Sequence, residues 1–272
     1  MCGIAGYSLH PDSGFDRTLA AQSLLAAIAE RGSDAVGYAY RCGEGPIVVH
    51  KQRTGASQLL EAVAIPSDAT QGLFHVRDYT KGHPSLAANN HPIRHGAIVG
   101  IHNGIIRNDD ELLAEHGIER AEPGMTVDSE AIFALVEKAP HAPAALEELY
   151  GSMATAWLDE RVPHTVSLAR GIGRPLWVGH VRGAVLFGST LDALELVERY
   201  AGVSLEKHEV PEGTLLTLGD GRVTAETSFE PDRSFSEEPL PAVRAPEERQ
   251  SCLERLAAVA SRRAAFAPAR AR

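Results

Sequence analysis

Short runs of β-forming residues recur along most of the chain, and this pattern limits the folds open to it more than any other feature. The expected strands are residues 2–8, 36–40, 47–50, 72–77, 97–102, 153–158, 165–169, 176–180, 184–187 and 214–218. Helical spacing of apolar residues predicts helices at residues 17–30, 109–116, 128–138 and 191–200. Many strands and few helices in mixed order predict an α+β fold, in which two packed antiparallel sheets are sandwiched by helices.

Chain length and the placement of prolines suggest two regions. The sequence has 272 residues, enough to bury a large core, and we assign residues 1–226 to one domain. Across 227–272, prolines interrupt a charged stretch, which predicts a linker followed by an amphipathic helix over 247–266. Both a solvated tail and a helix that docks on a partner agree with this last segment.

Charge and cysteine content argue against several classes of protein. A formal net charge of −10 disfavours a nucleic-acid surface, since such surfaces gain affinity from Lys and Arg. The three cysteines, at positions 2, 42 and 252, have no paired spacing, so neither a disulfide framework nor a metal site is expected. We also expect no cofactor. The sequence suggests no secretory signal and no membrane span. We therefore expect a cytoplasmic protein with small-molecule or protein partners.

Cys2 stands in the opening run Met1-Cys2-Gly3-Ile4-Ala5-Gly6-Tyr7, and removal of Met1 would leave it with a free α-amine beside its thiol. Such an amine titrates at roughly 7.7–8, so it could accept the thiol proton without a histidine partner. The glycines of this run suit an extended, buried segment that another backbone approaches closely. Cys2 could equally be an ordinary core residue, since free cysteine buries readily.

Four further sites offer groups that the hydrolysis of an amide needs. Asn103-Gly104 ends an expected strand, where a side-chain amide and a backbone N–H could bind one oxyanion; a plain Asn-Gly hairpin turn is the alternative. Arg77 could hold a carboxylate or lie on the surface. Asp128 could bind an ammonium group or cap the following helix. Arg31 lies beside a tight turn, where bracing of the structure explains it as well as chemistry does.

Five segments occur in the order of a known family. They are Cys2-Gly3-Ile4, Arg31-Gly32-Ser33-Asp34-Ala35-Val36-Gly37, His75-Val76-Arg77, His102-Asn103-Gly104-Ile105-Ile106 and Asp128-Ser129-Glu130. The chain resembles the class II glutamine amidotransferases, which are N-terminal-nucleophile (Ntn) hydrolases. The resemblance covers roughly residues 2–220, and a later segment, 168–176, is similar to the family's Arg-x-Gly-x-x-Pro-Leu segment. It is closest to the glutaminase domain of glucosamine-6-phosphate synthase, with features also of amidophosphoribosyltransferase.

This resemblance implies a four-layer αββα sandwich, the Ntn hydrolase fold, for the glutaminase domain at 1–226. It also implies that L-glutamine is hydrolysed to glutamate and ammonia through a γ-glutamyl thioester on Cys2, with the α-amine as the base. Asn103 and the N–H of Gly104 would form the oxyanion hole. Arg31 would lie behind the nucleophile.

The resemblance further implies how the substrate is held. Arg77 would bind the carboxylate of glutamine, Thr80 would add a hydroxyl or backbone contact, and Asp128 would bind the ammonium. The loop after Arg77 reads Asp78-Tyr79-Thr80-Lys81-Gly82, where the synthase-like pattern is Trp-Ala-Thr-His-Gly. Because this loop closes over glutamine in the family, the substitutions leave the closing mechanism and the ammonia acceptor open.

Family members usually fuse this domain to a synthase that consumes the ammonia, and residues 227–272 are too few to form one. We therefore expect a separate glutaminase subunit that passes ammonia to a synthase partner, and that could also form a homo-oligomer. The alternative is a catalytically weak or silent module that binds glutamine for regulation.

Overall fold

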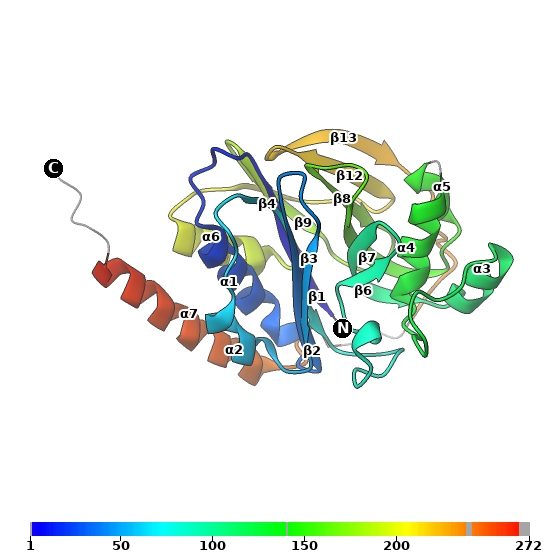
Figure 1. Ribbon diagram of the computed structural model, residues 1–272, viewed down its shortest axis with the longest axis horizontal. Coiled ribbons are helices and arrows are strands. Elements are labelled where there is room, and N and C mark those ends of the chain that lie inside the picture. The colour runs from blue at the N-terminus through cyan, green and yellow to red at the C-terminus, as the bar shows by residue number, and fades with distance from the viewer. Residues whose placement is uncertain (1, 140, 238–240, 267–272) are drawn as a thin grey trace.

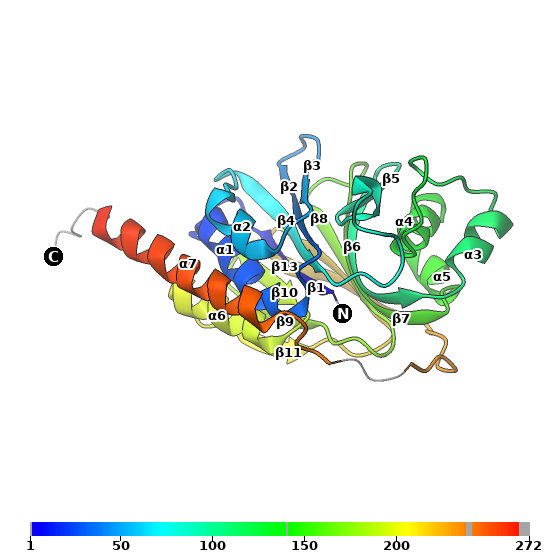
Figure 2. The same ribbon diagram turned by 90° about the horizontal axis from the view of Figure 1, so that it is seen from below.

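The computed structural model describes residues 2–139, 141–237 and 241–266, which form four layers (Figures 1 and 2). Two β-sheets lie face to face in the middle, and helices cover the outer side of each. All neighbouring strands within the two sheets are antiparallel. The α+β sandwich expected from the sequence is confirmed.

The first sheet contains the N-terminal strand at its centre. Its order is β11-β9-β10-β1-β4-β2-β3. In chain order these strands are β1 (Gly3–Leu9), β2 (Ala35–Cys42), β3 (Val48–Gln52), β4 (Ala69–Arg77), β9 (Trp177–Val181), β10 (Ala184–Gly188) and β11 (Glu206–Glu209).

The second sheet is built mainly from the middle of the chain. Its order is β13-β12-β8-β7-β6-β5. In chain order these strands are β5 (Ile93–His95), β6 (Ile98–Ile106), β7 (Gly151–Asp159), β8 (Thr165–Arg170), β12 (Thr214–Gly219) and β13 (Arg222–Ser228).

Helices from both ends of the chain cover the first sheet, and three helices lie on the side of the second sheet (Figure 2). The first group is α1 (Arg17–Ile28), α2 (Ala56–Leu59), α6 (Leu191–Ala201) and α7 (Pro246–Phe266). The second group is α3 (Asp109–Glu115), α4 (Ser129–Lys138) and α5 (Ala142–Glu147). Short 3₁₀ turns, η1 (Ala29–Arg31), η2 (Leu60–Ala62) and η3 (Ala87–Asn89), complete the elements.

Strand β1 belongs to two hydrophobic cores at once. Its side chains alternate, so Ile4 packs in the core between the sheets while Ala5 and Tyr7 pack in the core under α1. A Cβ atom at Gly6 would lie 2.3 Å from the carbonyl oxygen of Gly72 on β4. This close approach confirms the expectation of a buried glycine-containing strand.

The expected strands and helices are present, and the differences lie at the ends of elements, at the sheet edges and in two short helices, α2 and α5, that were not predicted. Strand β6 runs to Ile106 and pairs with β7 through Asn103 and Gly104, so these two residues are not the turn of a hairpin. Strands β5, β11 and β13 lay outside the predicted set. They are short or mostly polar, and pairing with a neighbouring strand, which local periodicity does not reveal, holds them in place.

Helix α7 packs on the helical layer of its own chain. Cys252 and Leu256 are fully buried in the same core as α1. Arg249 bridges η1 and α6, with one guanidinium nitrogen 2.7 Å from Glu30 and another 2.8 Å from Asp192. The described part of the apolar side of α7 is therefore covered by this chain. None of the helices within the described residues is long and apolar enough to cross a membrane.

Candidate active site

Cys2 lies directly before β1 and opens into a cavity of about 590 Å³. Its Sγ donates to the carbonyl oxygen of Asp78, 3.6 Å away. Burial raises the pKa of the Cys2 thiol above its ordinary value, so at neutral pH a base has to remove its proton. The lining of the cavity is Cys2, Asp78, Thr80, Asn103, Gly104, Ile105, Arg107, Arg174, Ser236 and Glu237.

Asn103 and Gly104 bring the second sheet to this cavity. The Asn103 side chain is fully buried, and neither its Nδ2 nor its Oδ1 has a hydrogen-bond partner among the described residues. A buried amide without a partner is costly, and such groups occur where a ligand is bound. Gly104 has a φ of 151°, and a Cβ there would lie 1.9 Å from the carbonyl oxygen of Ser152. The position therefore requires glycine.

Arg31 ends the η1 turn behind Cys2 and is almost fully buried. Its Nε donates to the carbonyl oxygen of Cys2 at 3.4 Å. Arg31 therefore contacts Cys2, the residue behind which the resemblance places it.

Arg77 lies under the loop that follows β4 and is 2% exposed. It is not among the residues that line the cavity. Its guanidinium donates to Asn90 Oδ1 at 2.6 Å, and to the carbonyl oxygens of Lys81 at 2.9 Å, Gly82 and Asn89. In this structure Arg77 therefore holds the loop, and its binding of a substrate carboxylate stays a prediction.

Asp128 immediately precedes α4 and is also buried outside the lining of the cavity. Its Oδ2 accepts a hydrogen bond from the backbone N–H of Ile106, 2.7 Å away, at the end of β6. Burial raises the pKa of this carboxyl to about 6, so it is mostly ionised at neutral pH. Asp128 lies behind β6 and outside the lining of the cavity, so its binding of the substrate ammonium stays a prediction.

Thr80 and Asp78 form the side of the cavity that belongs to the loop after β4. The Asp78 carboxylate pairs with Arg244, with 3.2 Å between Oδ2 and Nε. Thr80 is exposed at the opening, where its hydroxyl can meet a ligand entering the cavity.

Comparison with known proteins points in one direction. A family model described as a glutamine amidotransferase domain matches residues 62–196. The glutamine–fructose-6-phosphate aminotransferase (isomerizing) of Caulobacter vibrioides is 36% identical over 205 residues, which are 71% of this chain and 32% of that protein. The enzyme of the same name from Shigella flexneri is 32% identical over 227 residues, covering 79% of this chain and 36% of its own length. The chain contains a class II glutamine amidotransferase domain. It spans about a third of the length of these curated relatives.

Solved structures of class II glutamine amidotransferases share the fold. The glutamine phosphoribosylpyrophosphate amidotransferase of B. subtilis aligns with a TM-score of 0.65 and 19% identity, covering 84% of this chain and 49% of that one. A glutamine aminotransferase class-II domain protein from Silicibacter pomeroyi aligns with a TM-score of 0.54 and 20% identity, over 85% of this chain and 100% of that one. These likenesses establish the fold, in which two sheets lie between two layers of helices.

Six residues that line the cavity were not predicted as site residues from the sequence: Asp78, Ile105, Arg107, Arg174, Ser236 and Glu237. Arg174 belongs to the segment similar to Arg-x-Gly-x-x-Pro-Leu, so that motif could have indicated it. Glu237 forms an ion pair with Arg174, although it lies in the region expected to be a linker. No local pattern around Glu237 signals this, because only folding brings the two residues together.

The histidines near the site act as supports for its backbone. His102 Nδ1 lies 2.8 Å from Ser129 Oγ, and His75 Nε2 lies 3.1 Å from the carbonyl oxygen of His102. Burial lowers the pKa of each imidazole to about 3, so both are neutral at physiological pH. This agrees with a base other than histidine in the domain.

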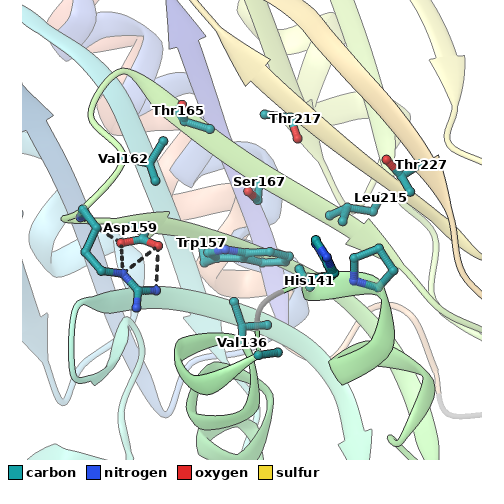
Figure 3. Close-up of a pocket in the computed structure, with 14 residues that line it drawn as sticks. Val136, His141, Trp157, Asp159, Val162, Thr165, Ser167, Leu215, Thr217 and Thr227 are labelled. Atoms are coloured by element: carbon teal, nitrogen blue, oxygen red, sulfur yellow. Dashed lines mark hydrogen bonds and ion pairs between the residues drawn. The ribbon is translucent and has the colours of Figure 1, made fainter.

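A larger cavity of about 690 Å³ lies on the outer face of the second sheet (Figure 3). Trp157 forms its base, with Val136 and His141 on one side and Ser167 and Thr165 on the other. The ion pair drawn in the figure joins Asp159 to a neighbouring arginine. Of the described residues in its lining none is a cysteine, so the cavity at Cys2 is the better candidate for the active site.

Proposed function

We propose that this domain hydrolyses the side-chain amide of L-glutamine to glutamate and ammonia, with Cys2 as the nucleophile. The observation that supports this most is the meeting of three groups in one cavity: the Cys2 thiol, the unpartnered Asn103 amide and the strand position that only Gly104 can occupy. The two sheets supply these groups separately, and an acyl transfer needs them together.

The reaction follows from these groups. After Met1 is removed, the α-amine of Cys2 takes the thiol proton, and Sγ attacks the amide carbon of glutamine. Asn103 Nδ2 and the Gly104 N–H donate to the oxyanion that forms. The proton passes to the leaving nitrogen, which departs as ammonia and leaves a γ-glutamyl thioester. Water then hydrolyses the thioester, which releases glutamate and restores the thiol.

The proposed grip on glutamine uses the two charged residues behind the cavity. Arg77 would exchange some of its loop carbonyls for the substrate carboxylate, next to Thr80, and Asp128 would receive the ammonium. Such an exchange replaces neutral acceptors by a charged one, which strengthens the hydrogen bonds that Arg77 donates.

We further propose that the ammonia passes to a synthase partner. The names of the two relatives combine glutamine with an aminotransfer, and the region similar to this chain is about a third of each. Co-purification of a tagged chain from its own cells would test the partner. Full glutaminase turnover without a partner, and no partner recovered, would contradict this part of the proposal.

The glutaminase proposal is tested by intact mass and a glutamate-release assay. We expect loss of Met1, and we expect Cys2→Ala to abolish release of glutamate. Asn103→Ala should lower kcat by about 10²–10³-fold, because one oxyanion donor is lost. Cys42→Ala is the matched control, since Cys42 lies on β2 outside the lining of the cavity. Unchanged turnover in Cys2→Ala would refute the mechanism.

A second candidate function is a regulatory module that binds glutamine with little or no turnover. It is favoured by the engagement of Arg77 with the loop and by the presence of Glu237 in the cavity. Calorimetric binding of glutamine by the wild-type protein, with Met1 retained and no glutamate released, would decide for this alternative.

A further inference from the structure

A segment from beyond the second sheet closes one side of the nucleophile cavity. Ser236 and Glu237 line the cavity at Cys2 and also a neighbouring cavity of about 490 Å³. Arg174 is the third residue shared by both. These three residues therefore form the partition between the two spaces.

An ion pair between two largely buried side chains holds the partition. Arg174 is 7% exposed, and its Nη2 pairs with Glu237 Oε1. The hydroxyl of Ser152, a fully buried residue, donates to the same carboxylate oxygen at 3.4 Å. Glu237, which lies outside both sheets, thus brings its carboxylate to the guanidinium of Arg174, between β8 and β9, and to the hydroxyl of Ser152 on β7.

Arg174, and Arg31 with which it interacts electrostatically, each hold a buried donor that has no acceptor among the described residues. Arg174 Nε has no hydrogen-bond partner among the described residues, and neither has Nη2 of the buried Arg31. The two guanidinium groups also interact electrostatically: burial lowers the pKa of Arg31, Glu30 opposes this, and Arg174 lowers it further. Donors left over beside a bound carboxylate are typical of a site that accepts anionic groups.

The origin of Glu237 makes it a replaceable occupant. Its segment is tied down by edge contact between Phe235 and Tyr150, at 5.3 Å between ring centres, and by an exposed pair between Arg233 and Glu212 at 3.3 Å. Neither contact involves Arg174 or Ser152, which carry the donors. The guanidinium of Arg174, in contrast, is buried and needs a counter-charge whenever Glu237 withdraws.

We propose that Arg174 and Ser152 form an anion subsite beside Cys2, that Glu237 is its intramolecular occupant, and that a carboxylate or phosphate group of a small molecule displaces Glu237 to bind there. Displacement would also join the two cavities and widen access to Cys2. The subsite goes beyond glutamine hydrolysis, because it concerns a second ligand group.

The test is calorimetric titration of the full chain with inorganic phosphate and with succinate, without glutamine. An internal competitor lowers the apparent affinity for an added anion in proportion to the fraction of molecules whose site it leaves free. Glu237→Gln should therefore bind one of the two anions at least about tenfold more tightly than the wild-type protein. Asp232→Asn is the matched control, since this carboxylate in the same segment accepts hydrogen bonds from Ser234, outside the cavity, and the variant should behave like the wild type.

Arg174→Met should remove binding, and Arg174→Lys should retain a weaker form of it. Thermal unfolding of each variant checks that it folds; if Arg174→Met does not, the comparison of Glu237→Gln with Asp232→Asn decides. Tighter binding of phosphate assigns a phosphate ligand, and tighter binding of succinate assigns a carboxylate. Equal affinity in Glu237→Gln and the wild type, or binding that survives Arg174→Met, would overturn the subsite. Because no glutamine is present, these outcomes do not depend on glutaminase activity.

Discussion

Gly104 shows at the scale of one residue how the backbone shapes the proposed oxyanion hole. Its φ is 151°, and only 1.9 Å would separate an added Cβ from the carbonyl oxygen of Ser152, so there is no room for a side chain. Strand β6 can therefore approach β7 closely, and the unusual φ of Gly104 sets the direction of its backbone N–H.

Gly104→Ala should cost about 1–3 kcal/mol of stability through strain and should remove glutaminase activity. Thermal unfolding and glutamate release measure the two effects. Gly14→Ala is the control, since no heavy atom lies within 4 Å of the added Cβ, and it should change neither. A Gly104→Ala protein with wild-type stability and turnover would show that the close approach does not matter.

Asp128 predicts a dependence on pH. Burial raises its pKa from 3.8 to about 6, so the folded chain binds this proton more tightly than the unfolded chain. The stability contributed by the protonated carboxyl is fully present below pH 3.8 and is lost as pH rises through about 6. Ionisation over the same range gives Asp128 the negative charge that the proposed binding of an ammonium group requires.

Asp128→Asn should remove about 2–3 kcal/mol of this pH-dependent loss, since one pKa unit corresponds to about 1.4 kcal/mol. It should also raise the KM for glutamine. Denaturant unfolding at several pH values and steady-state kinetics measure these effects. Glu111→Gln changes an exposed carboxyl on α3 and should leave both unchanged. An identical pH profile for Asp128→Asn and the wild type would contradict the assignment.

At the scale of elements, the loop after β4 is fastened to α3. Lys81 Nζ lies 2.7 Å from both carboxylate oxygens of the buried Asp109 and 2.8 Å from Asp110. Arg120 pairs with the same two acids. The loop that carries Thr80 is therefore positioned by charges on a helix beside the second sheet.

Lys81→Met should destabilise the protein by about 1–3 kcal/mol, because a buried carboxylate loses one of its partners. The KM for glutamine should rise as the loop loses its anchor. Lys138→Met removes an exposed lysine of α4 that bonds a backbone carbonyl, and it should have little effect. Unaltered KM and melting temperature would exclude an anchoring role for Lys81.

At the scale of the whole molecule, the candidate site depends on both sheets. Cys2 enters from the first sheet, and Asn103 from the second, across the core that the sheets share. The chain that follows the last strand, β13, returns to the first sheet and to the cavity. Glu237 reaches the cavity, and α7 crosses back over α1 (Figure 2).

Leu256→Ala should test how strongly α7 belongs to this assembly. Leu256 is fully buried, so its truncation should cost about 2–4 kcal/mol in a chemical denaturation experiment. Leu253 is only partly buried in the same helix, and Leu253→Ala should cost clearly less. Equal and negligible losses would indicate that α7 is not part of the folded domain in solution.

The sequence by itself determined the strand and helix pattern, the two-sheet class and the positions of the groups that chemistry would need. Alternating and helical apolar spacing is local, and local periodicity is enough to define such elements. Only the tertiary structure decided that Asn103 and Gly104 continue a strand, that Arg77 binds loop carbonyls, and that Glu237 meets Arg174. These relations join residues far apart in the chain, and packing sets their distances and buried charges, which no short segment records.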